Sequence, residues 1–305
     1  MELVRGLHNV DRAARGCVLT IGAFDGIHRG HQEMIRVLRS LAAKHSLPAA
    51  LLSFEPTPRE FFAKATPPAR LTRFREKYQA LRRYGVERFV CLRFDSALRS
   101  MSADEFVGKV LVEALGARHI VVGHDFKFGR NMAGNVATLR AAGPAAGFVV
   151  TEVPPFEIDG ERVSSSLIRA ALDAGDMARA ALLLGRPYRM TGKVIEGSKL
   201  GRKLGFPTAN LGAHSEQFPP DGVYVAEATL AGALYRGVAN LGYRPTVSAG
   251  KPERLLELHL FDLNRDIYGA EVEVRFLRYL RPEQKFENVE ALAAQIARDV
   301  AQARG

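Results

Sequence analysis

The stretch TIGAFDGIHRGHQEMI, Thr20 to Ile35, decides the fold of the first half of the chain. The run GCVLTIGAF, which overlaps its start, is apolar and β-rich and is typical of a buried strand. A helical pattern, HQEMIRVLRSLAAKH, follows at once. FDGIHRGH is therefore predicted to be the turn between a strand and a helix, and open parallel sheets bind ligands at such carboxyl ends of strands.

This turn has the residues of an anion site. Three glycines let the backbone come close to a ligand: Gly22, Gly26 and Gly30. The helix is expected to begin near Arg29, where free N–H groups and the helix dipole attract negative charge. His28 and His31 can project towards the same point and donate hydrogen bonds to phosphate oxygens. The pattern thus indicates a nucleotide phosphate site. The alternatives are two packing histidines, or a metal site for which the nearby carboxylates are only Asp25 and Glu33.

Residues 17–185 alternate strand-like and helix-like segments. The strand-like runs are CVLTIGAF, AALLSFEP, RFVCLRF, HIVVG and GFVVTEVP. Between them lie the helical patterns HQEMIRVLRSLAAKH, FREKYQALRRYG and SADEFVGKVLVEALG, the last with a capping-box spacing of Ser102 and Glu105 and a stop at Gly116. This order predicts βαβ units and a parallel sheet.

After Gly185-Arg186-Pro187 the alternation of strand-like and helix-like segments ends. The strand-like runs YRMTGKVIEG, GVYVAEATL, ALYRGVANLG, RLLELHLFD and EVEVRFLRYL follow one another, and the next long helical pattern is NVEALAAQIARDVAQA at the end. The second half therefore reads as an antiparallel barrel or sandwich with one terminal helix. A length of 305 residues also favours two domains, which we place at 1–185 and 186–305.

Composition narrows the class of protein. Hydrophobic residues make up 47% and charged residues 25%, as in ordinary globular chains. Cys17 and Cys91 each lie in an apolar run, which disfavours disulfides and a cysteine zinc site and predicts a reducing, cytoplasmic setting. We recognise no signal peptide and no apolar run long enough to span a membrane. The net charge of +10 suits anionic ligands, although an arginine-rich solubilising surface would give the same number.

A run of serines near the end of the α/β half supports the phosphate interpretation. In RVSSSLIRAAL, Ser164, Ser165 and Ser166 precede a helix that carries Arg169. Hydroxyls and free N–H groups at a helix start, with one guanidinium, can hold a polyphosphate. The alternative is a simple serine N-cap.

The second half has its own candidate site in GSKLGRKLGFPTANL, residues 197–211. Glycines and basic residues alternate there and can wrap phosphates: Gly197, Lys199, Gly201, Arg202, Lys203 and Gly205. After Pro207, Thr208 and Asn210 offer oxygens two residues apart, on one side of an extended strand. Such hard oxygen ligands suit Mg²⁺ held together with substrate phosphates.

Glu257 is the carboxylate that a phosphoryl transfer to a hydroxyl would need. It lies between leucines in LLELHLFDLNRDIYG, and a carboxylate beside the attacking oxygen is part of such chemistry. The alternative is an outward-facing strand residue, because a buried unpaired carboxylate is costly.

The first half resembles the nucleotidylyltransferase superfamily. FDGIHRGH, followed much later by SSSLIR, is similar to the two elements that flank the ATP phosphates in that superfamily. The segments between them resemble the adenylyltransferase half of the bacterial bifunctional riboflavin kinase/FMN adenylyltransferase family, and they are LSFEPTP, LTRFREKYQALRRYGV and GHDFKFG. The resemblance implies a Rossmann-like domain. It assigns His28, His31 and Arg169 to catalysis, and it assigns nucleotide or phosphate binding to Gly22, Phe24, Asp25, Gly30, Asp125 and Ser164 to Ser166. Thr57 stands where many members have histidine.

The second half resembles the flavokinase barrel of the same family. The ordered motifs are Gly-x-x-x-Gly-Arg-x-Leu-Gly-Phe-Pro-Thr-Ala-Asn, Gly-Val-Tyr, Asn-Leu-Gly-x-x-Pro-Thr and Glu-x-His-x-Phe-Asp. The resemblance implies that Thr208 and Asn210 hold Mg-ATP and that Glu257 is the catalytic base. It implies phosphate binding by Lys199, Gly201, Arg202, Gly205 and Pro207. Ile267 stands where leucine is common.

Together the two resemblances imply two consecutive reactions with ATP, riboflavin and FMN. The barrel would phosphorylate riboflavin to FMN, and the α/β half would transfer AMP from a second ATP to FMN, giving FAD and pyrophosphate. One alternative is an adenylyltransferase with a non-catalytic flavin-binding barrel, which the intact Pro-Thr-Ala-Asn and Glu257 disfavour. The other is a nucleic-acid-binding protein, which the scattered charges and the absence of Trp disfavour.

Overall fold

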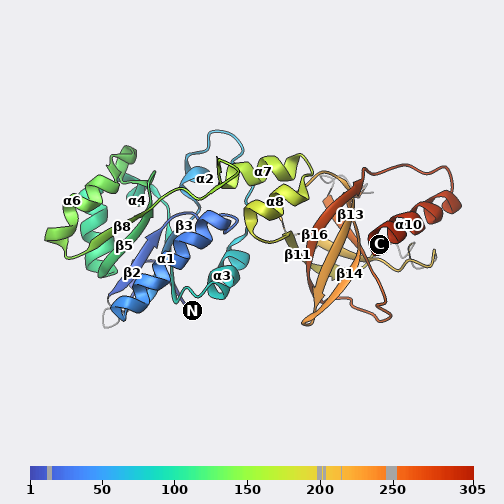
Figure 1. Ribbon diagram of the computed structural model, residues 1–305, viewed down its shortest axis with the longest axis horizontal. Coiled ribbons are helices and arrows are strands. Elements are labelled where there is room, and N and C mark those ends of the chain that lie inside the picture. Colours follow the sequence, from blue (N-terminus) through green and yellow to red (C-terminus); the bar gives the residue numbers. More distant parts are fainter. Residues whose placement is uncertain (12–15, 198–200, 202–203, 214, 245–252) are drawn as a thin grey trace. The chain divides into compact units, whose positions relative to one another are not determined.

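The computed structural model describes residues 1–11, 16–197, 201, 204–213, 215–244 and 253–305. Its contacts divide the chain into two compact units, Met1–Ser165 and Ser166–Gly305. Figure 1 shows an α/β arrangement in the first unit and a barrel in the second.

The first unit is built on a parallel sheet of six strands in the order β1-β4-β3-β2-β5-β8. The strands are β1 (Glu2–Arg5), β2 (Cys17–Ile21), β3 (Ala49–Glu55), β4 (Arg88–Arg93), β5 (Ala117–Gly123) and β8 (Val149–Val153). Every residue of β2 is buried, as expected for a strand covered on both faces. Two short hairpins, β6 (Lys127–Phe128) with β7 (Gly134–Asn135) and β9 (Glu157–Ile158) with β10 (Glu161–Arg162), complete the strands of this unit.

Helices connect these strands. They are α1 (Arg29–His45), α2 (Pro58–Phe62), α3 (Phe74–Arg83), α4 (Ser96–Ser100), α5 (Ala103–Glu105), which continues as a π-helix over Phe106–Ala114, and α6 (Val136–Ala146), with short 3₁₀ turns at Leu7–Asn9 and Arg130–Met132. The predicted capping box of Ser102 and Glu105 forms at the start of α5. Apolar clusters pack between the helices and the sheet, one around Leu19, Leu52 and Ile120 and another around Phe24, Leu51 and Phe89.

The strand order places the first strand-to-helix turn at the switch point of the sheet. From β2 the chain adds β3 and β4 on one side, and then returns to add β5 on the other side of β2. The turn after β2 therefore opens at the carboxyl edge between two diverging connections, which is where open α/β sheets bind ligands.

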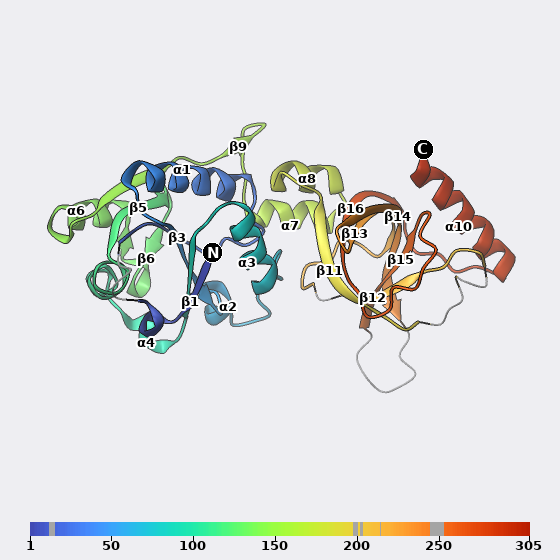
Figure 2. The same ribbon diagram turned by 90° about the horizontal axis from the view of Figure 1, so that it is seen from below.

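The second unit contains a closed antiparallel barrel in the order β11-β12-β15-β14-β13-β16. The strands are β11 (Tyr188–Ile195), β12 (Ala209–Ala213), β13 (Gly222–Leu230), β14 (Ala233–Arg244), β15 (Glu253–Leu260) and β16 (Glu271–Arg281). β16 pairs with both β11 and β13, so the sheet closes on itself and leaves no open edge. Figure 2 views this barrel from a second direction.

Helices cover the barrel. α7 (Ser165–Asp173) and α8 (Met177–Leu184) precede it, and α8 contacts β11 and β16. The terminal helix α10 (Val289–Arg304) begins at the N-cap Asn288 and contributes Ala303 to an apolar cluster with Val223, Val238 and Phe261. The guanidinium of Arg281 at the end of β16 forms an ion pair at 2.7 Å with Asp299 of α10.

The structure confirms the predicted fold class: a parallel sheet with helices, an antiparallel barrel and a terminal helix. All strands predicted for both halves are present. The predicted strand runs did not include β1, a four-residue edge strand, or β12, which follows a proline and contains glycine. They also did not include the two-residue strands β6, β7, β9 and β10. All of these are short segments in which β-propensity is weak.

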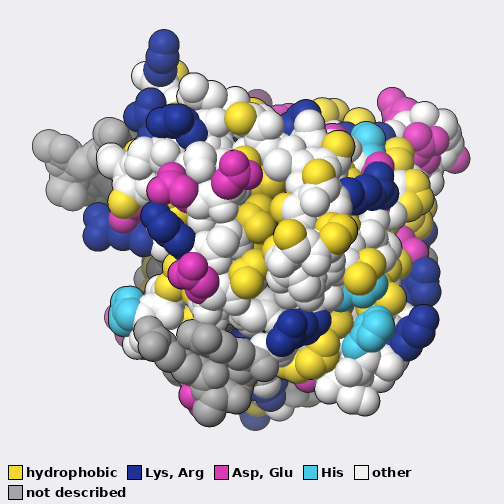
Figure 3. All heavy atoms as spheres, turned by 90° about the vertical axis from the view of Figure 1, so that its left-hand side faces the viewer, with side chains coloured by type: hydrophobic (Ala, Val, Ile, Leu, Met, Phe, Trp, Pro, Cys, Tyr) yellow, Lys and Arg dark blue, Asp and Glu magenta, His cyan; other side chains and the backbone are white. Residues whose placement is uncertain are grey.

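The described residues contain no helix long and apolar enough to cross a membrane. Figure 3 shows the face of the first unit that lies to the left in Figure 1, and its basic and acidic side chains are interspersed. The charge on this face is thus not gathered into one basic patch.

Candidate functional site

The FDGIHRGH turn holds an unusual backbone. Phe24 and Ile27 have positive φ angles of 49° and 42°, which non-glycine residues seldom adopt, least of all a β-branched isoleucine. Both side chains are buried, with 1% and 0% exposure, in the cluster beneath α3. Burial of these side chains holds the turn in its strained conformation, as is common at ligand sites.

His28 is the N-cap of α1, so the helix begins at Arg29 as predicted. Its Nδ1 accepts a hydrogen bond from the N–H of His31 at 3.4 Å. A neutral imidazole whose Nδ1 accepts must carry its proton on Nε2. His28 therefore satisfies one N–H of the helix start and carries its own ring proton on Nε2.

His31 lies against His28. The two rings stack with centroids 3.7 Å apart, and Phe24 lies 4.6 Å from His31 on its other side. The Nδ1 of His31 is buried and has no hydrogen-bond partner among the described residues. Burial lowers the pKa of His31 well below its usual value, and the charges of His28, Lys77 and Arg162 lower it further. The ring is therefore neutral at pH 7, and an anion bound beside it would raise its pKa.

Asp25 ties the turn to the segment before α3. Its Oδ1 accepts the N–H groups of Leu71 and Thr72, each at 3.0 Å, and the Thr72 hydroxyl at 3.3 Å. Thr72 Oγ1 also accepts the N–H of Gly26 at 3.0 Å. The carboxylate thus positions the turn through the 71–72 backbone.

Two distant predicted segments meet the turn within the first unit. The Ser165 hydroxyl donates to the carbonyl of Asp25 at 3.0 Å, so the serine run reaches the FDG segment. Arg162 donates to Oδ2 of Asp125 at 2.7 Å, so the start of RVSSS meets GHDFKFG. Burial raises the pKa of Asp125, but the hydrogen bond and charge of Arg162 outweigh it and leave that pKa lowered.

The glycines of the turn lie against its rings. A Cβ at Gly22 would approach the Phe24 ring at 3.1 Å, and a Cβ at Gly30 would approach the His28 ring at 3.3 Å. Side chains at either position would press on the rings that line the turn. The other predicted residues of the serine element, Ser164, Ser166 and Arg169, lie at the start and in the middle of α7, and the last two belong to the second unit.

Thr57, where many family members have histidine, is the N-cap of α2. Its side chain and that of Glu60 form a reciprocal capping box. Glu60 and Glu55 also accept hydrogen bonds from Arg70 at 2.5 Å. Threonine at this position therefore has a structural use, in capping a helix at the carboxyl end of β3.

In the barrel, strand register brings three polar residues to one face. Glu257 of β15 lies directly opposite Asn210 of β12 on one side and Asn240 of β14 on the other. Directly opposed residues of antiparallel strands project to the same face. The neighbours Leu256 and Leu258 are 1% exposed and face the barrel interior, so the three polar side chains lie on the outer face.

Two glycines of the predicted phosphate loop, Gly197 and Gly201, lie against this face. A Cβ at Gly197 would overlap the Asn210 amide, and a Cβ at Gly201 would lie 2.9 Å from Thr208 Oγ1, so both side chains point at the loop. Gly205 has a φ of 82°, in a turn where the N–H of Phe206 donates to the Gly201 carbonyl at 2.8 Å. The predicted phosphate ligands Lys199 and Arg202 lie outside the described residues.

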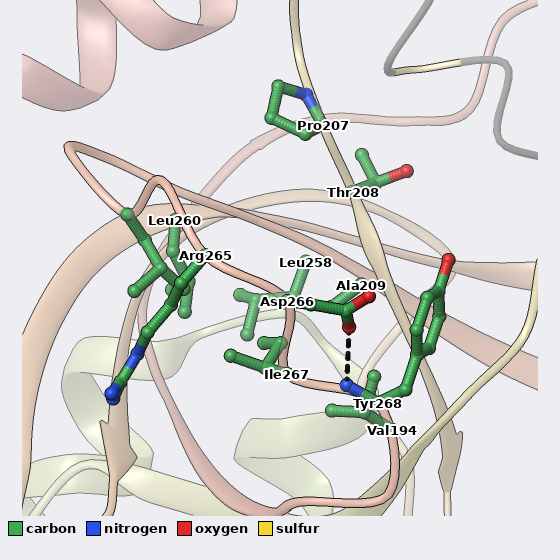
Figure 4. Close-up of a pocket in the computed structure, with 11 residues that line it drawn as sticks. Val194, Pro207, Thr208, Ala209, Leu258, Leu260, Arg265, Asp266, Ile267 and Tyr268 are labelled. Atoms are coloured by element: carbon green, nitrogen blue, oxygen red, sulfur yellow. Dashed lines mark hydrogen bonds between the residues drawn. The ribbon is translucent and has the colours of Figure 1, made fainter.

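A small hollow, partly open to solvent, adjoins Pro207 and Thr208. Figure 4 shows Pro207, Thr208 and Ala209 along one side of it and Asp266, Ile267 and Tyr268 along another, with a hydrogen bond from the Tyr268 N–H to Asp266 at 2.9 Å. Its floor is apolar, with Val194, Leu258 and Leu260. Pro207 is fixed by its carbonyl, which lies 2.9 Å from Nδ1 of His259.

The described residues contain no group of three or more His, Cys, Asp or Glu side chains able to hold a metal ion. The oxygens of Thr208 and Asn210, which face one loop, fit the alternative of a hard cation that takes its other ligands from phosphates and water.

Sequence reasoning missed several residues that the structure brings to these sites. Arg162 heads the quoted serine run, and Asn240 is the first residue of the quoted Asn-Leu-Gly motif. Lys77 could have been found in the sequence, because it is a charged residue in the apolar stripe of α3 with Ala80 and Leu81. Thr72 gave none, because its contact with Asp25 spans 47 residues.

Comparisons with known proteins match both halves. A family model described as FAD synthetase matches residues 10–167, and one described as riboflavin kinase matches residues 184–305. The chain thus combines two flavin-directed, nucleotide-dependent transferase domains.

The relatives show the family. Proteins of Pseudomonas fluorescens and Haemophilus influenzae, both named bifunctional riboflavin kinase/FMN adenylyltransferase, are 47% and 45% identical to this chain; the matches cover 100% of the chain and 97% and 98% of the relatives. The chain belongs to the bifunctional riboflavin kinase/FMN adenylyltransferase family.

A solved structure from Streptococcus pneumoniae has a closely similar fold. It is titled a macrolide-efflux protein, and it aligns with a TM-score of 0.91 and 32% identity over 100% of this chain and 99% of its own. Its title describes that protein, and what carries over to this chain is the fold.

Proposed function

We propose that this chain makes FAD from riboflavin in two steps, each with one ATP. The barrel phosphorylates the 5′-hydroxyl of riboflavin, and the α/β unit transfers AMP to the resulting FMN. The observation that carries the proposal is the match of two family models, FAD synthetase over residues 10–167 and riboflavin kinase over residues 184–305.

In the barrel, Glu257 takes the proton from the ribityl hydroxyl as its oxygen attacks the γ-phosphorus of ATP. The bond from that phosphorus to the β-phosphate oxygen breaks, and ADP leaves. The glycine loop, with Lys199, Gly201, Arg202 and Gly205, holds the phosphates. The apolar hollow beside Pro207 suits the flat adenine base.

Thr208 and Asn210 would hold Mg²⁺ in this unit. When bound, the ion neutralises phosphate charge and orients the triphosphate. Asn210 lies opposite Glu257 in register, so the phosphates and the proton acceptor meet on one face of the barrel.

In the α/β unit, a phosphate oxygen of FMN attacks the α-phosphorus of ATP, and pyrophosphate leaves. His28 donates through Nε2 to the phosphates. His31, neutral without substrate, gains proton affinity as negative charge arrives beside it. Gly22, Phe24 and Gly30 shape the space beside these rings.

Three further groups complete the adenylyltransferase site. Ser164 and Ser165, at the end of the first unit, bind phosphate oxygens, and for Ser166 and Arg169 the family resemblance implies the same role. Asp125 accepts a hydrogen bond from Arg162 and so orients the segment that leads into α7. Asp25 contributes by positioning the turn rather than by contact with phosphate, since two anions repel.

We place the functional boundary after Gly185. The riboflavin kinase match begins at residue 184, and Gly185 ends α8 in a left-handed conformation. The contacts group α7 and α8 with the barrel, whereas the FAD synthetase match ends at residue 167. The two helices are thus the segment that truncation experiments should vary.

We also propose a cytoplasmic enzyme that does not bind nucleic acid. Cys17 and Cys91 are both free buried thiols, which suits a reducing compartment. The interspersed charges on the face in Figure 3 do not resemble a nucleic-acid-binding stripe. A DNA and RNA binding assay at graded salt would reveal strong binding if that second proposal were wrong.

Chromatography of the products after incubation with riboflavin, ATP and Mg²⁺ tests the main proposal. FMN and FAD together are the expected result. FMN alone would refute adenylylation, and FAD from supplied FMN but not from riboflavin would reduce the barrel to a binding module.

A further inference from the structure

Lys77 is the one charged residue of the apolar stripe of α3. Its side chain is 3% exposed, whereas Arg75, Arg82 and Arg83 of the same helix point to solvent. A lysine is seldom buried to this degree unless a partner compensates its charge. We therefore expect a group that compensates the charge of the Lys77 ammonium.

No such partner exists within the described residues. Nothing in that part of the chain forms a hydrogen bond or ion pair with the Lys77 ammonium, in contrast to Arg70, whose guanidinium contacts Glu55 and Glu60. Nζ is not among the fully covered polar atoms that lack a partner. The ammonium is thus not completely covered by the described residues.

The nearby carboxylates are already engaged. Asp25 accepts the backbone of Leu71 and Thr72, and Glu55 accepts Arg70. Burial lowers the pKa of Lys77, and the charges of Asp25 and Glu55 only partly restore it. An additional anion at this point would be stabilised by the ammonium and would stabilise it in return.

Lys77 faces the adenylyltransferase site. The residues just before α3, Leu71 and Thr72, are bonded to Asp25 of the FDG turn, which anchors the first turn of α3 there. The charge of Lys77 acts on His31, whose ring stacks on His28. Phe24 and Ile27 of the turn also pack in one apolar cluster with Ala80 and Leu81 of α3. The buried face of α3, which carries Lys77, therefore lies against the turn that holds the two imidazoles.

We propose that the Lys77 ammonium binds a phosphate group of a substrate in the α/β unit and is a further binding residue for adenylyl transfer. The inference rests on the proposed function. The phosphate is that of FMN or of ATP, and a compact ammonium suits either as a point charge.

The Lys77→Met variant tests this, because methionine keeps the stem and removes the charge. We expect kcat/KM for FAD formation to fall roughly tenfold or more, as for loss of a charge-assisted hydrogen bond. The KM for FMN alone should rise if Lys77 holds the FMN phosphate, and the KM for ATP alone if it holds the triphosphate. Lys77→Arg should recover part of the loss.

Controls separate binding from folding. Phosphorylation of riboflavin by the same variant should stay within twofold of wild type, and Arg82→Met removes a charge from the exposed face of the same helix and should change neither reaction. The melting temperature of Lys77→Met should not fall, because the variant removes a buried charge.

Three results would overturn the inference. One is a folded Lys77→Met variant with wild-type kcat/KM for FAD. Another is a wild-type kcat/KM for FAD formation in the Lys77→Gln variant, which is to be measured if the methionine variant does not fold. The third is loss of folding in both variants, which would make Lys77 structural. If wild-type protein makes no FAD from FMN and ATP, the proposed function itself fails.

Discussion

Replacing Asp25 tests whether this carboxylate acts through the backbone that it holds. Asp25→Ala removes the acceptor of two N–H groups, on Leu71 and Thr72, both 3.0 Å from Oδ1. Leu71 and Thr72 are only 4% and 6% exposed, so water replaces the acceptor poorly. Each buried donor left without a partner costs about 1–3 kcal/mol, so for the two donors we expect the α/β unit to lose roughly 2–6 kcal/mol.

Asp25→Asn is the matched control. Both N–H groups reach the same oxygen, Oδ1, and an amide oxygen can take its place. What remains lost is the charge assistance, about 1 kcal/mol. The asparagine variant should therefore lie between wild type and the alanine variant.

Hydrogen exchange of the peptide that covers residues 71–81 reports on this contact directly. A loss of about 2 kcal/mol or more predicts exchange faster by roughly thirtyfold or more, because each 1.4 kcal/mol is a factor of ten. FAD formation should fall in Asp25→Ala, while riboflavin phosphorylation should not change. Unchanged exchange in Asp25→Ala, or equal damage from Ala and Asn, would refute the reasoning.

Four further outcomes are expected. His28→Ala should suppress FAD formation and spare FMN formation, and loss of both in a folded protein would contradict two independent sites. Glu257→Gln should do the reverse, sparing adenylylation of supplied FMN in the same chromatographic assay. Gly197→Ala should abolish the kinase reaction, since its Cβ overlaps the Asn210 amide, whereas Gly212→Ala, which meets nothing within 4 Å, should not. Because the folded-state pKa of His31 lies below the usual 6.5, the unfolded chain protonates first, and the free energy of unfolding should fall as pH drops below about 6.5. Urea titrations at pH 7 and pH 5 should show a smaller fall in His31→Gln, and an equal fall would exclude His31 as the cause.

Much of the site followed from local pattern. The glycines and histidines of FDGIHRGH lie within eleven residues of the end of β2, so strand, turn and helix signals placed them together. The spacing of Thr208 and Asn210 likewise predicted that both side chains lie on one side of an extended strand, and the two lie beside Gly201 and Gly197. These inferences needed only the periods of strands and helices.

Contacts across long stretches of sequence were beyond such reasoning. Asp125 pairs with Arg162, and Asp25 with Thr72, through loops whose paths no local period records. The alignment of Asn240 with Glu257 depends on the register of β14 and β15, and a shift of one residue would turn these side chains to opposite faces.

The sequence by itself determined two halves, a parallel α/β unit and an antiparallel barrel, because hydrophobic periodicity and turn residues are local properties. It also determined the chemistry of the motifs, since the side chains of histidine, serine and hard-oxygen donors carry their reactivity with them. Only the tertiary structure decided how those side chains are used: that His28 caps α1, that Asp25 holds a backbone, and that Lys77 is buried without a partner in the described residues. The burial of a side chain and its hydrogen-bond partners depend on residues that are distant in sequence, and the sequence alone does not give the distances between those residues in space.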